Sequence, residues 1–274
     1  MAGCPSRPAL RWHGGKWLLA PWVIEHFGPH RVYVEPYGGA ASVLLRKPRT
    51  YAEIYNDLDQ SVVNLFSVLR SDRAGELIDK LRLTPFARTE FRAAYEPAID
   101  PVERARRLII RSFMGHGSNG HARSTGFRAN SNRSGTTPAK DWDNLPDAML
   151  QVIDRFQGVI IESKNAIDVM QQHDSRHTLH YVDPPYMFET RSDLAKDYAF
   201  ELTDADHVAL LETLKSLEGL VVLSGYPSAL YDEHLIRWKR IERTALADGA
   251  RKRTEVLWLN ECAVAAQPAA DLFD

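Results

Sequence analysis

Short apolar runs alternate with amphipathic segments in the first part of the chain. Residues 31–35 are rich in valine and tyrosine and predict a strand that leads into a glycine-rich turn. A helix is expected from Ser42, a second strand over 51–55 and a helix over 61–69. The apolar positions of that last helix share one face: Val62, Leu65, Phe66 and Leu69. This order of elements is typical of the start of a doubly wound α/β fold.

The same alternation returns near residue 158. Apolar runs predict strands over 158–162, 178–182, 220–224 and 255–260. Between the second and third of these, Thr203 is suited to cap a helix. The apolar face of that helix is expected to be Val208, Leu211, Leu214 and Leu217. The predicted fold class is therefore α/β, with a doubly wound, Rossmann-like sheet.

Residues 71–159 interrupt this pattern. Their first half reads as charged helix, and the stretch after Phe113 is rich in Gly, Ser, Asn, Thr and Arg. Between 101 and 140 there are eight Lys or Arg and one acidic residue. A solvated loop is one interpretation, although a long irregular stretch inside a compact domain is usually functional or disordered. We predict a discontinuous α/β domain, residues 1–70 and 160–274, with a mainly helical insert at 71–159.

Composition narrows the class of protein. The chain has 274 residues, 44% of them hydrophobic, and a formal net charge of −2, as expected for a globular protein with a substantial core. The two cysteines form no CxxC pair, and the closest histidines, His173, His177 and His180, lack further ligands at the usual spacing. We therefore expect no disulfide framework and no metal. A signal peptide and a run of 18 apolar residues are both absent from the sequence, which favours a cytoplasmic protein.

The first strand ends in a turn that is suited to a ligand. Gly38 and Gly39 allow close approach of the backbone, and the helix that follows offers free amide groups at its N-terminus. Asp57 follows the second strand, where an acid can accept hydrogen bonds from ribose hydroxyls. The spacing is not GxGxxG. A nucleoside-type ligand and a plain turn with a helix cap both remain open from these residues alone.

The segment Asp183-Pro-Pro-Tyr186 follows a buried strand and is more specific. In a doubly wound sheet it would lie at the crevice beyond the strand ends. The Asp183 carboxylate and the Pro184 carbonyl could accept both hydrogens of a planar amine such as that of adenine, while Pro185 stiffens the exit. Tyr186 could stack on a base that has left the duplex. These residues predict catalysis by positioning and electrostatics.

Several motifs together resemble the D12 class, or Dam type, of S-adenosylmethionine-dependent DNA adenine-N6 methyltransferases, in the α order of motifs. Trp12-His-Gly-Gly-Lys16 resembles the N-terminal cofactor motif, and Glu35-Pro-Tyr-Gly-Gly-Ala-Ala-Ser42 the glycine loop. Tyr55-Asn-Asp57 resembles the ribose-binding segment, and Asp183 to Tyr186 the catalytic tetrad. The resemblance extends from residue 11 to about residue 260 and implies a methyltransferase sheet with a recognition insert.

The resemblance implies a role for each matching residue. Asp183 orients the target amine beside the methyl group of the cofactor, together with Pro184, Pro185 and Tyr186. The cofactor, S-adenosyl-L-methionine, is expected to contact Trp12, Lys16, Glu35, Tyr37, Gly38, Gly39, Ala40, Ser42, Asn56, Asp57 and Asp183. One position departs from the family: Ala41 stands where the loop usually has its second glycine. An extra methyl group is tolerated there if φ stays negative.

The basic insert is expected to contact DNA. Asn119 to Arg123 resembles the family's recognition loop, and an arginine can bind guanine O6 and N7 in a bidentate way. Arg123 is interpreted as the base reader, with phosphate contact as the alternative. Phosphate contacts are expected from Arg128 and Arg133, and Arg111 is a further DNA-binding candidate. Arg251–Arg253 is either a further backbone contact or a solvated turn.

The sequence thus predicts an enzyme that methylates the N6 amine of a flipped-out adenine in duplex DNA. GATC-containing sites are the family default, and the divergent 118–134 loop leaves relaxed specificity open. The alternatives are an inactive DNA-binding regulator on the same fold, and a cytosine-N4 or RNA adenine methyltransferase. A monomer without metal or membrane contact is expected, of bacterial or phage origin, with or without a partner restriction enzyme.

Overall fold

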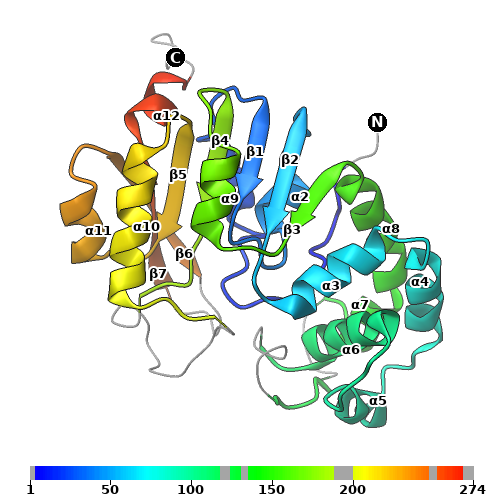
Figure 1. Cartoon of the computed structure of the whole chain (residues 1–274). Helices are drawn as coiled ribbons and strands as arrows, with labels where there is room; N and C mark the ends of the chain where they lie inside the picture. Colours follow the sequence, from blue (N-terminus) through cyan, green and yellow to red (C-terminus); the bar gives the residue numbers. More distant parts are fainter. Residues whose placement is uncertain (1–3, 118–123, 131–134, 188–199, 247–251, 268–274) are drawn as a thin grey trace, which may run out of the picture.

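The computed structural model describes residues 4–117, 124–130, 135–187, 200–246 and 252–267 (Figure 1). A seven-stranded sheet forms its centre, in the order β3-β2-β1-β4-β5-β7-β6. The strands are β1 Val32–Glu35, β2 Ala52–Asn56, β3 Val159–Glu162, β4 Thr178–Val182, β5 Leu220–Gly225, β6 Lys239–Leu246 and β7 Lys252–Leu259. Strands β1 to β5 are parallel, while β7 pairs antiparallel with both β5 and β6.

The strand order reverses between β1 and β4. From β1 the chain continues to β2 on one side, and β4 and β5 lie on the other side. At such a switch point the loops after two neighbouring strands diverge, which leaves a crevice at their carboxyl ends. The residues that follow β1 and β4 are therefore placed to bind a ligand, and these are the glycine loop and the Asp183 tetrad.

Helices cover the sheet and extend from one end of it. Figure 1 shows α9 and α10 in front of the sheet and the helices α4 to α8 grouped beyond β3. The helices that accompany the sheet are α1 Ala20–Ile24, α2 Ser42–Arg46, α3 Gln60–Leu69, α9 Ala166–Gln172, α10 Asp204–Ser216, α11 Ala229–His234 and α12 Glu261–Ala265. The others are α4 Ala74–Leu83, α5 Arg88–Ala93, α6 Pro101–Met114, α7 Pro138–Asp143 and α8 Leu145–Phe156.

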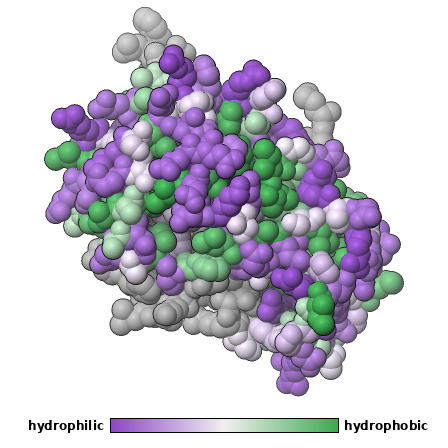
Figure 2. All heavy atoms as spheres, viewed as in Figure 1, coloured by the Kyte–Doolittle hydropathy of each residue, from purple (hydrophilic) through white to green (hydrophobic). Residues whose placement is uncertain are grey.

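Two apolar layers lie on the two faces of the sheet. Because strand side chains alternate, Val222 of β5 joins the layer of α1, α2, α3 and the insert helices. Its neighbours Val221 and Leu223 join the layer of α10 and α11. The α3–α6 contact links the helical group to the sheet domain. Figure 2, which has the same viewpoint as Figure 1, shows mostly hydrophilic residues on this face of the molecule.

The predicted elements are largely confirmed. Each predicted strand is present, and Thr203 caps α10 in a reciprocal capping box with Asp206. The α/β, doubly wound, Rossmann-like fold class is confirmed. Strand β6 was not predicted, because its charged sequence lies at the sheet edge and lacks an apolar run. The division at 71–159 stays a prediction. No helix within the described ranges has the length and apolar character to cross a membrane.

Candidate active site

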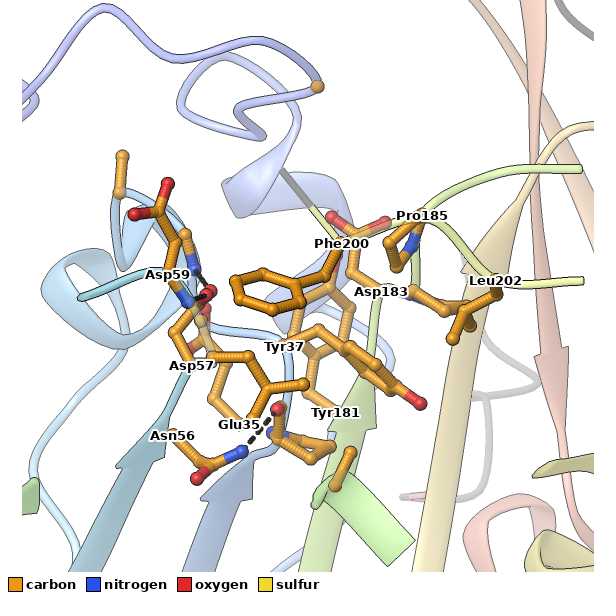
Figure 3. A pocket seen from close by; sticks show the side chains of 18 of the residues that line it. Glu35, Tyr37, Asn56, Asp57, Asp59, Tyr181, Asp183, Pro185, Phe200 and Leu202 are labelled. Atoms are coloured by element: carbon orange, nitrogen blue, oxygen red, sulfur yellow. Dashed lines mark hydrogen bonds between the residues drawn. The ribbon is translucent and has the colours of Figure 1, made fainter. Parts of the chain in front are cut away.

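A pocket opens at the carboxyl ends of β1, β2 and β4 (Figure 3). One end is formed by Asp183 and Pro184, and the other by Asp57, Leu58 and the segment before α9. The residues predicted to contact the cofactor all line this pocket: Trp12, Lys16, Glu35, Tyr37, Gly38, Gly39, Ala40, Ser42, Asn56, Asp57 and Asp183. Pro184 and Pro185 line it as well. Side chains from widely separated parts of the sequence thus surround one cavity.

Asp183 forms an ion pair with Lys16 at the edge of the pocket. The Lys16 ammonium is 3.0 Å from Oδ2 of Asp183, with side-chain exposures of 5% and 16%. Lys16 also donates to the carbonyl of Gly14 at 2.9 Å, which fixes the position of the ammonium. Burial raises the pKa of Asp183, while Lys16 opposes this rise. The lysine therefore favours an ionised carboxylate at this position.

Tyr186 is held beside Asp183 by its hydroxyl group. The Tyr186 oxygen lies 3.0 Å from Oδ1 of Asp183 and 3.0 Å from Oε2 of Glu255. The Lys16 ammonium lies 4.7 Å from the centroid of the tyrosine ring, and Tyr226 packs against the ring at 4.4 Å. Tyr186 is 6% exposed and does not line the pocket. Stacking of a base on Tyr186 would therefore require one of these neighbours to move.

The glycine loop follows β1 and is closely packed. A Cβ atom at Gly38 would lie 2.2 Å from the Tyr55 ring, and one at Gly39 would lie 2.9 Å from Nε1 of Trp12. Gly39 also has a φ of +47°, and the Tyr55 hydroxyl donates to its carbonyl at 2.7 Å. Glycine at these two positions allows the loop to approach the aromatic rings, and no larger residue fits there.

The backbone of Ala41 does not have the negative φ that was expected from the sequence. Its φ is +55°, in the left-handed region, so the negative φ under which alanine would be tolerated is not adopted. Left-handed backbone is unfavourable for alanine by ~1–2 kcal/mol. Ala41 is also fully buried and precedes the first residue of α2. The loop thus keeps a glycine-like backbone at this position despite the extra methyl group.

Asp57 connects the glycine loop to the turn after β2. Its Oδ2 accepts from the Gly39 amide at 2.7 Å, and its Oδ1 accepts from the Asp59 amide at 2.8 Å. Burial raises the pKa of Asp57 to about 6, although both amide groups act in the opposite direction. The N-cap of α3 is Asp59, which accepts from the Ser61 amide, so Asp57 is not the cap. Asp57 is left facing the pocket.

Glu35 and Asn56 lie deeper, at the strand ends. Oε2 of Glu35 accepts from the Tyr33 hydroxyl at 2.8 Å and from the Leu44 amide at 3.0 Å, which ties β1 to the first turn of α2. Burial raises the pKa of Glu35 to about 8. The Asn56 side chain bonds to the Pro36 carbonyl and to both backbone groups of Lys164. These two residues fix the loops that form the pocket.

Aromatic and apolar side chains fill the space between the acids. Figure 3 shows the Phe200 ring between the Asp57–Asp59 turn and Asp183, with Tyr37 below it. Phe200 is 50% exposed, and it lines the pocket together with Leu58 and Ile167. An apolar strip beside a buried acid is a suitable environment for a flat heterocycle with attached hydroxyl groups.

The sequence matches a known family over most of its length. The family model of the D12 class N6 adenine-specific DNA methyltransferases matches residues 12–244. The chain belongs to this family. It is an adenine-specific DNA methyltransferase, with DNA as its substrate and a methyl donor as its cosubstrate. The match covers the Lys16 segment, the glycine loop, Asp57 and the tetrad.

The chain is also similar to several DNA adenine methylases, at about a quarter sequence identity. The chain is 25% identical over 270 residues to a DNA adenine methylase of Salmonella typhi, covering 92% of this chain and 94% of the relative. It is 24% identical over 269 residues to the DNA adenine methylase of Escherichia coli K12, with the same coverage. A DNA adenine methylase of Salmonella typhimurium is 26% identical over 239 residues, which are 83% of this chain and 84% of the relative.

The residues predicted to bind DNA in this D12 methyltransferase fall into two groups. Asn119, Arg123 and Arg133 lie outside the described residues. Arg128 is 8% exposed, and its guanidinium donates to the Phe113 carbonyl at 2.9 Å. A phosphate contact by Arg128 would require it to leave this position. Arg111 lies on α6, 5.6 Å from the centroid of the Tyr95 ring, and burial lowers its pKa.

Some residues of the site were missed in the sequence. Ser224 is the second-last residue of β5, next to β4, and its hydroxyl lies 3.3 Å from that of Tyr186. Its position at the end of a buried strand beside the tetrad strand was a usable signal. Glu255 was read as the start of an apolar strand. An acid at the start of an apolar strand indicates a site residue less clearly than Ser224 does, because the partner of Glu255, Tyr186, is distant in the sequence. Among the described residues, no group of three or more His, Cys, Asp or Glu is arranged to hold a metal ion.

Proposed function

We propose that this chain transfers the methyl group of S-adenosyl-L-methionine to the N6 amine of an adenine that is flipped out of duplex DNA. The observation that supports this most strongly is the position of Asp183 and Pro184. They stand at the end of β4 in the same pocket as the glycine loop, and Lys16 favours the ionised form of the aspartate. The pocket therefore combines a carboxylate suited to an amine with a surface suited to a nucleoside.

The pocket fits the proposed cofactor. Gly38 and Gly39 line the pocket, and their lack of side chains lets the loop pack against Tyr55 and Trp12. Asp57 would accept from the ribose hydroxyls, and Leu58, Ile167 and Phe200 would contact the adenine ring. Glu35, Tyr37, Ala40 and Ser42 would surround the methionine portion, with Trp12, Lys16 and Asn56 completing the lining of the pocket. When bound, S-adenosyl-L-methionine supplies an electrophilic methyl group.

The residues after β4 would prepare the target amine. The lone pair of an adenine amine is delocalised into the ring, which makes the nitrogen a poor nucleophile. Hydrogen bonds from the amine to the Asp183 carboxylate and the Pro184 carbonyl would favour a more pyramidal nitrogen. Pro185 would hold this exit rigid. Catalysis then depends on orientation and fixed charges, and needs no covalent intermediate with the enzyme.

Recognition of the target sequence would depend on the insert. We propose that Arg123 binds a guanine edge with Asn119 beside it, and that Arg133 contacts phosphates. Arg111 and Arg128 would support this surface, the latter by fixing the backbone at Phe113. The target is then either a GATC-containing site or a set of sites with relaxed sequence specificity. The proposed enzyme acts as a monomer.

The test is methylation of defined duplexes with the purified protein, followed by nucleoside mass spectrometry and mapping of modified positions. We expect N6-methyladenine that depends on S-adenosyl-L-methionine and is lost in D183A, while D183A still binds DNA. Formation of N4-methylcytosine without N6-methyladenine would overturn the assignment of the target base. No methylation by the wild type at saturating cofactor would instead support a DNA-binding regulator.

A further inference from the structure

Three side chains from three strands meet at one hydroxyl group. The Tyr186 oxygen lies 3.0 Å from Oδ1 of Asp183, 3.0 Å from Oε2 of Glu255 and 3.3 Å from Oγ of Ser224. Asp183 and Tyr186 follow β4, Ser224 lies near the end of β5, and Glu255 lies on β7. The side chains of Tyr186, Ser224 and Glu255 are all at least nine-tenths buried. Water therefore has little access to this group of hydrogen bonds.

The number of protons in this group is limited. A tyrosine hydroxyl has one proton and can donate to one carboxylate at a time. Two ionised carboxylates at 3.0 Å from the same oxygen would leave one of them facing a lone pair. A carboxyl group that keeps its own proton can instead donate to the tyrosine oxygen. Both 3.0 Å contacts of the Tyr186 oxygen can therefore be hydrogen bonds when one of the two acids is neutral.

The surrounding charges indicate which acid is neutral. Lys16 is paired directly with Asp183 at 3.0 Å, which favours the ionised form of that residue. Burial is the main cause that raises the pKa of Glu255, and the charge of Asp183 raises it further. Lys16, the hydrogen bond with Tyr186 and Arg253 lower this pKa. One buried ammonium balances one carboxylate, so the second carboxyl group is more stable when neutral.

We propose that Glu255 is a positioning residue for methyl transfer, whose neutral carboxyl group donates to the Tyr186 hydroxyl while that hydroxyl donates to Oδ1 of Asp183. This inference rests on the proposed function, in which Asp183 holds the target amine. The chain of hydrogen bonds fixes one oxygen of Asp183, and Lys16 fixes the other. Glu255 itself does not line the pocket. It acts on the substrate through Tyr186 and Asp183.

The proposal has a consequence at alkaline pH. The titratable and charged groups around Glu255 are Asp183 and Tyr186 beyond β4, Lys16 before α1, Tyr226 after β5, Tyr181 of β4 and Arg253 of β7. Arg243 of β6 is its register partner and is exposed. When Glu255 loses its proton, two carboxylates compete for one hydroxyl, and Oδ1 of Asp183 is no longer held by Tyr186, although Lys16 still holds Oδ2. The rate of methyl transfer is then expected to fall.

The test compares Glu255→Gln with Glu255→Ala in single-turnover methylation of duplex DNA across pH. Glutamine can donate to Tyr186 and has no titrating proton, so E255Q should keep the neutral-pH rate within ~3-fold of the wild type and remove the alkaline fall due to Glu255. E255A should lower the rate ~10-fold, the equivalent of one hydrogen bond of ~1.4 kcal/mol. The same substitution at exposed Glu233 of α11, E233A, is the matched control and should leave the rate unchanged.

A second variant protects the test against misfolding. Y186F keeps the ring and removes the hydroxyl, so Y186F and the double variant Y186F/E255A should show the same rate, since both break the same chain. Thermal unfolding and cofactor binding are measured on each variant. Equal rates and equal pH profiles for the wild type, E255Q and E255A would overturn the proposal, as would additive effects in the double variant. If E255Q lowered the methylation rate as much as E255A, the proposal that Glu255 is neutral would be wrong. Absence of N6-methyladenine in the wild type would instead contradict the proposed function.

Discussion

The ammonium of Lys16 lies 3.0 Å from Oδ2 of Asp183, in a site where both side chains are largely withdrawn from water. The lysine comes from the segment before α1, and the aspartate from the loop after β4. This pair joins the proposed cofactor segment to the proposed catalytic tetrad. A buried carboxylate needs such a partner, because burial by itself favours its protonated form.

Removal of the Lys16 ammonium should change the pH dependence of the enzyme. Burial raises the pKa of Asp183 and Lys16 holds it down, so K16M should raise it further. The ionised fraction at neutral pH then falls, and the acid limb of the methylation rate should move to higher pH. Single-turnover rates between pH 5.5 and 8.5 measure this shift. The matched control is K164M, in which an exposed lysine paired with Glu162 is removed. An acid limb that does not move in K16M would contradict this role of the ion pair.

Cofactor binding should weaken at acid pH because of Asp57. Its pKa is raised to about 6, and only the ionised form can accept hydrogen bonds from ribose hydroxyls with both oxygens. Affinity for S-adenosyl-L-methionine should therefore fall as pH decreases through about 6. D57N should bind ~10-fold more weakly at pH 8, since bonds to a charged acceptor are worth ~1.5–3 kcal/mol, and should lose this pH dependence. Calorimetry from pH 5 to pH 8 tests both points. An unchanged affinity in D57N would remove Asp57 from the cofactor site.

The glycine loop should not accept a side chain at Gly38. The added Cβ atom of G38A would lie 2.2 Å from the Tyr55 ring, which is packed against Phe66 and Phe156 and has no room to move. Overpacking of this kind is expected to cost ~1–3 kcal/mol of stability and to displace the loop.

The chain offers a matched control for G38A. No atom lies within 4 Å of the corresponding Cβ position at Gly75 in α4, so G75A should raise stability by ~0.5–1 kcal/mol. The free energy of unfolding, from chemical denaturation, and the affinity for S-adenosyl-L-methionine are measured for both variants. Equal stability and equal affinity for G38A and the wild type would contradict the close packing of the loop.

Stability should decrease at alkaline pH because of Glu35. Burial raises the pKa of Glu35 in the folded state to about 8. The contribution of the neutral carboxyl group to the free energy of unfolding is therefore complete below its ordinary pKa, and it is lost as pH rises through about 8. The free energy of unfolding should fall by ~2 kcal/mol more in the wild type than in E35Q between pH 6 and pH 9. Denaturant titrations at the two pH values measure the difference. The same decrease in both proteins would assign the pH dependence to other groups.

Local sequence patterns were sufficient for much of the fold. The buried strand over 178–182 and the cap at Thr203 depend on neighbouring residues, and both were predicted correctly. Strand β6 was missed because its stability comes from pairing with β7 along its whole length, and its own residues are charged. The left-handed backbone of Ala41 was also missed. The loop adopts it against the preference of the residue itself.

The site shows the same difference between local and distant information. The tetrad and the glycine loop are contiguous segments, so their residues could be named from the sequence. The hydrogen bond between Tyr186 and Glu255 joins residues that only the pairing of β5 with β7 brings together. The burial of Arg128 likewise depends on contacts with Phe113 and Asp141, which the basic composition of the insert does not reveal.

The role of Asp183 and Pro184 in holding the target amine is tested by the structure of a ternary complex with duplex DNA and a cofactor analogue that cannot transfer a methyl group. We expect a flipped-out adenine whose N6 lies ~3 Å from a carboxylate oxygen of Asp183 and ~3 Å from the Pro184 carbonyl, with the analogue between the glycine loop and Asp57. An adenine that remains stacked in the duplex, or an amine bound away from Asp183 and Pro184, would contradict this role.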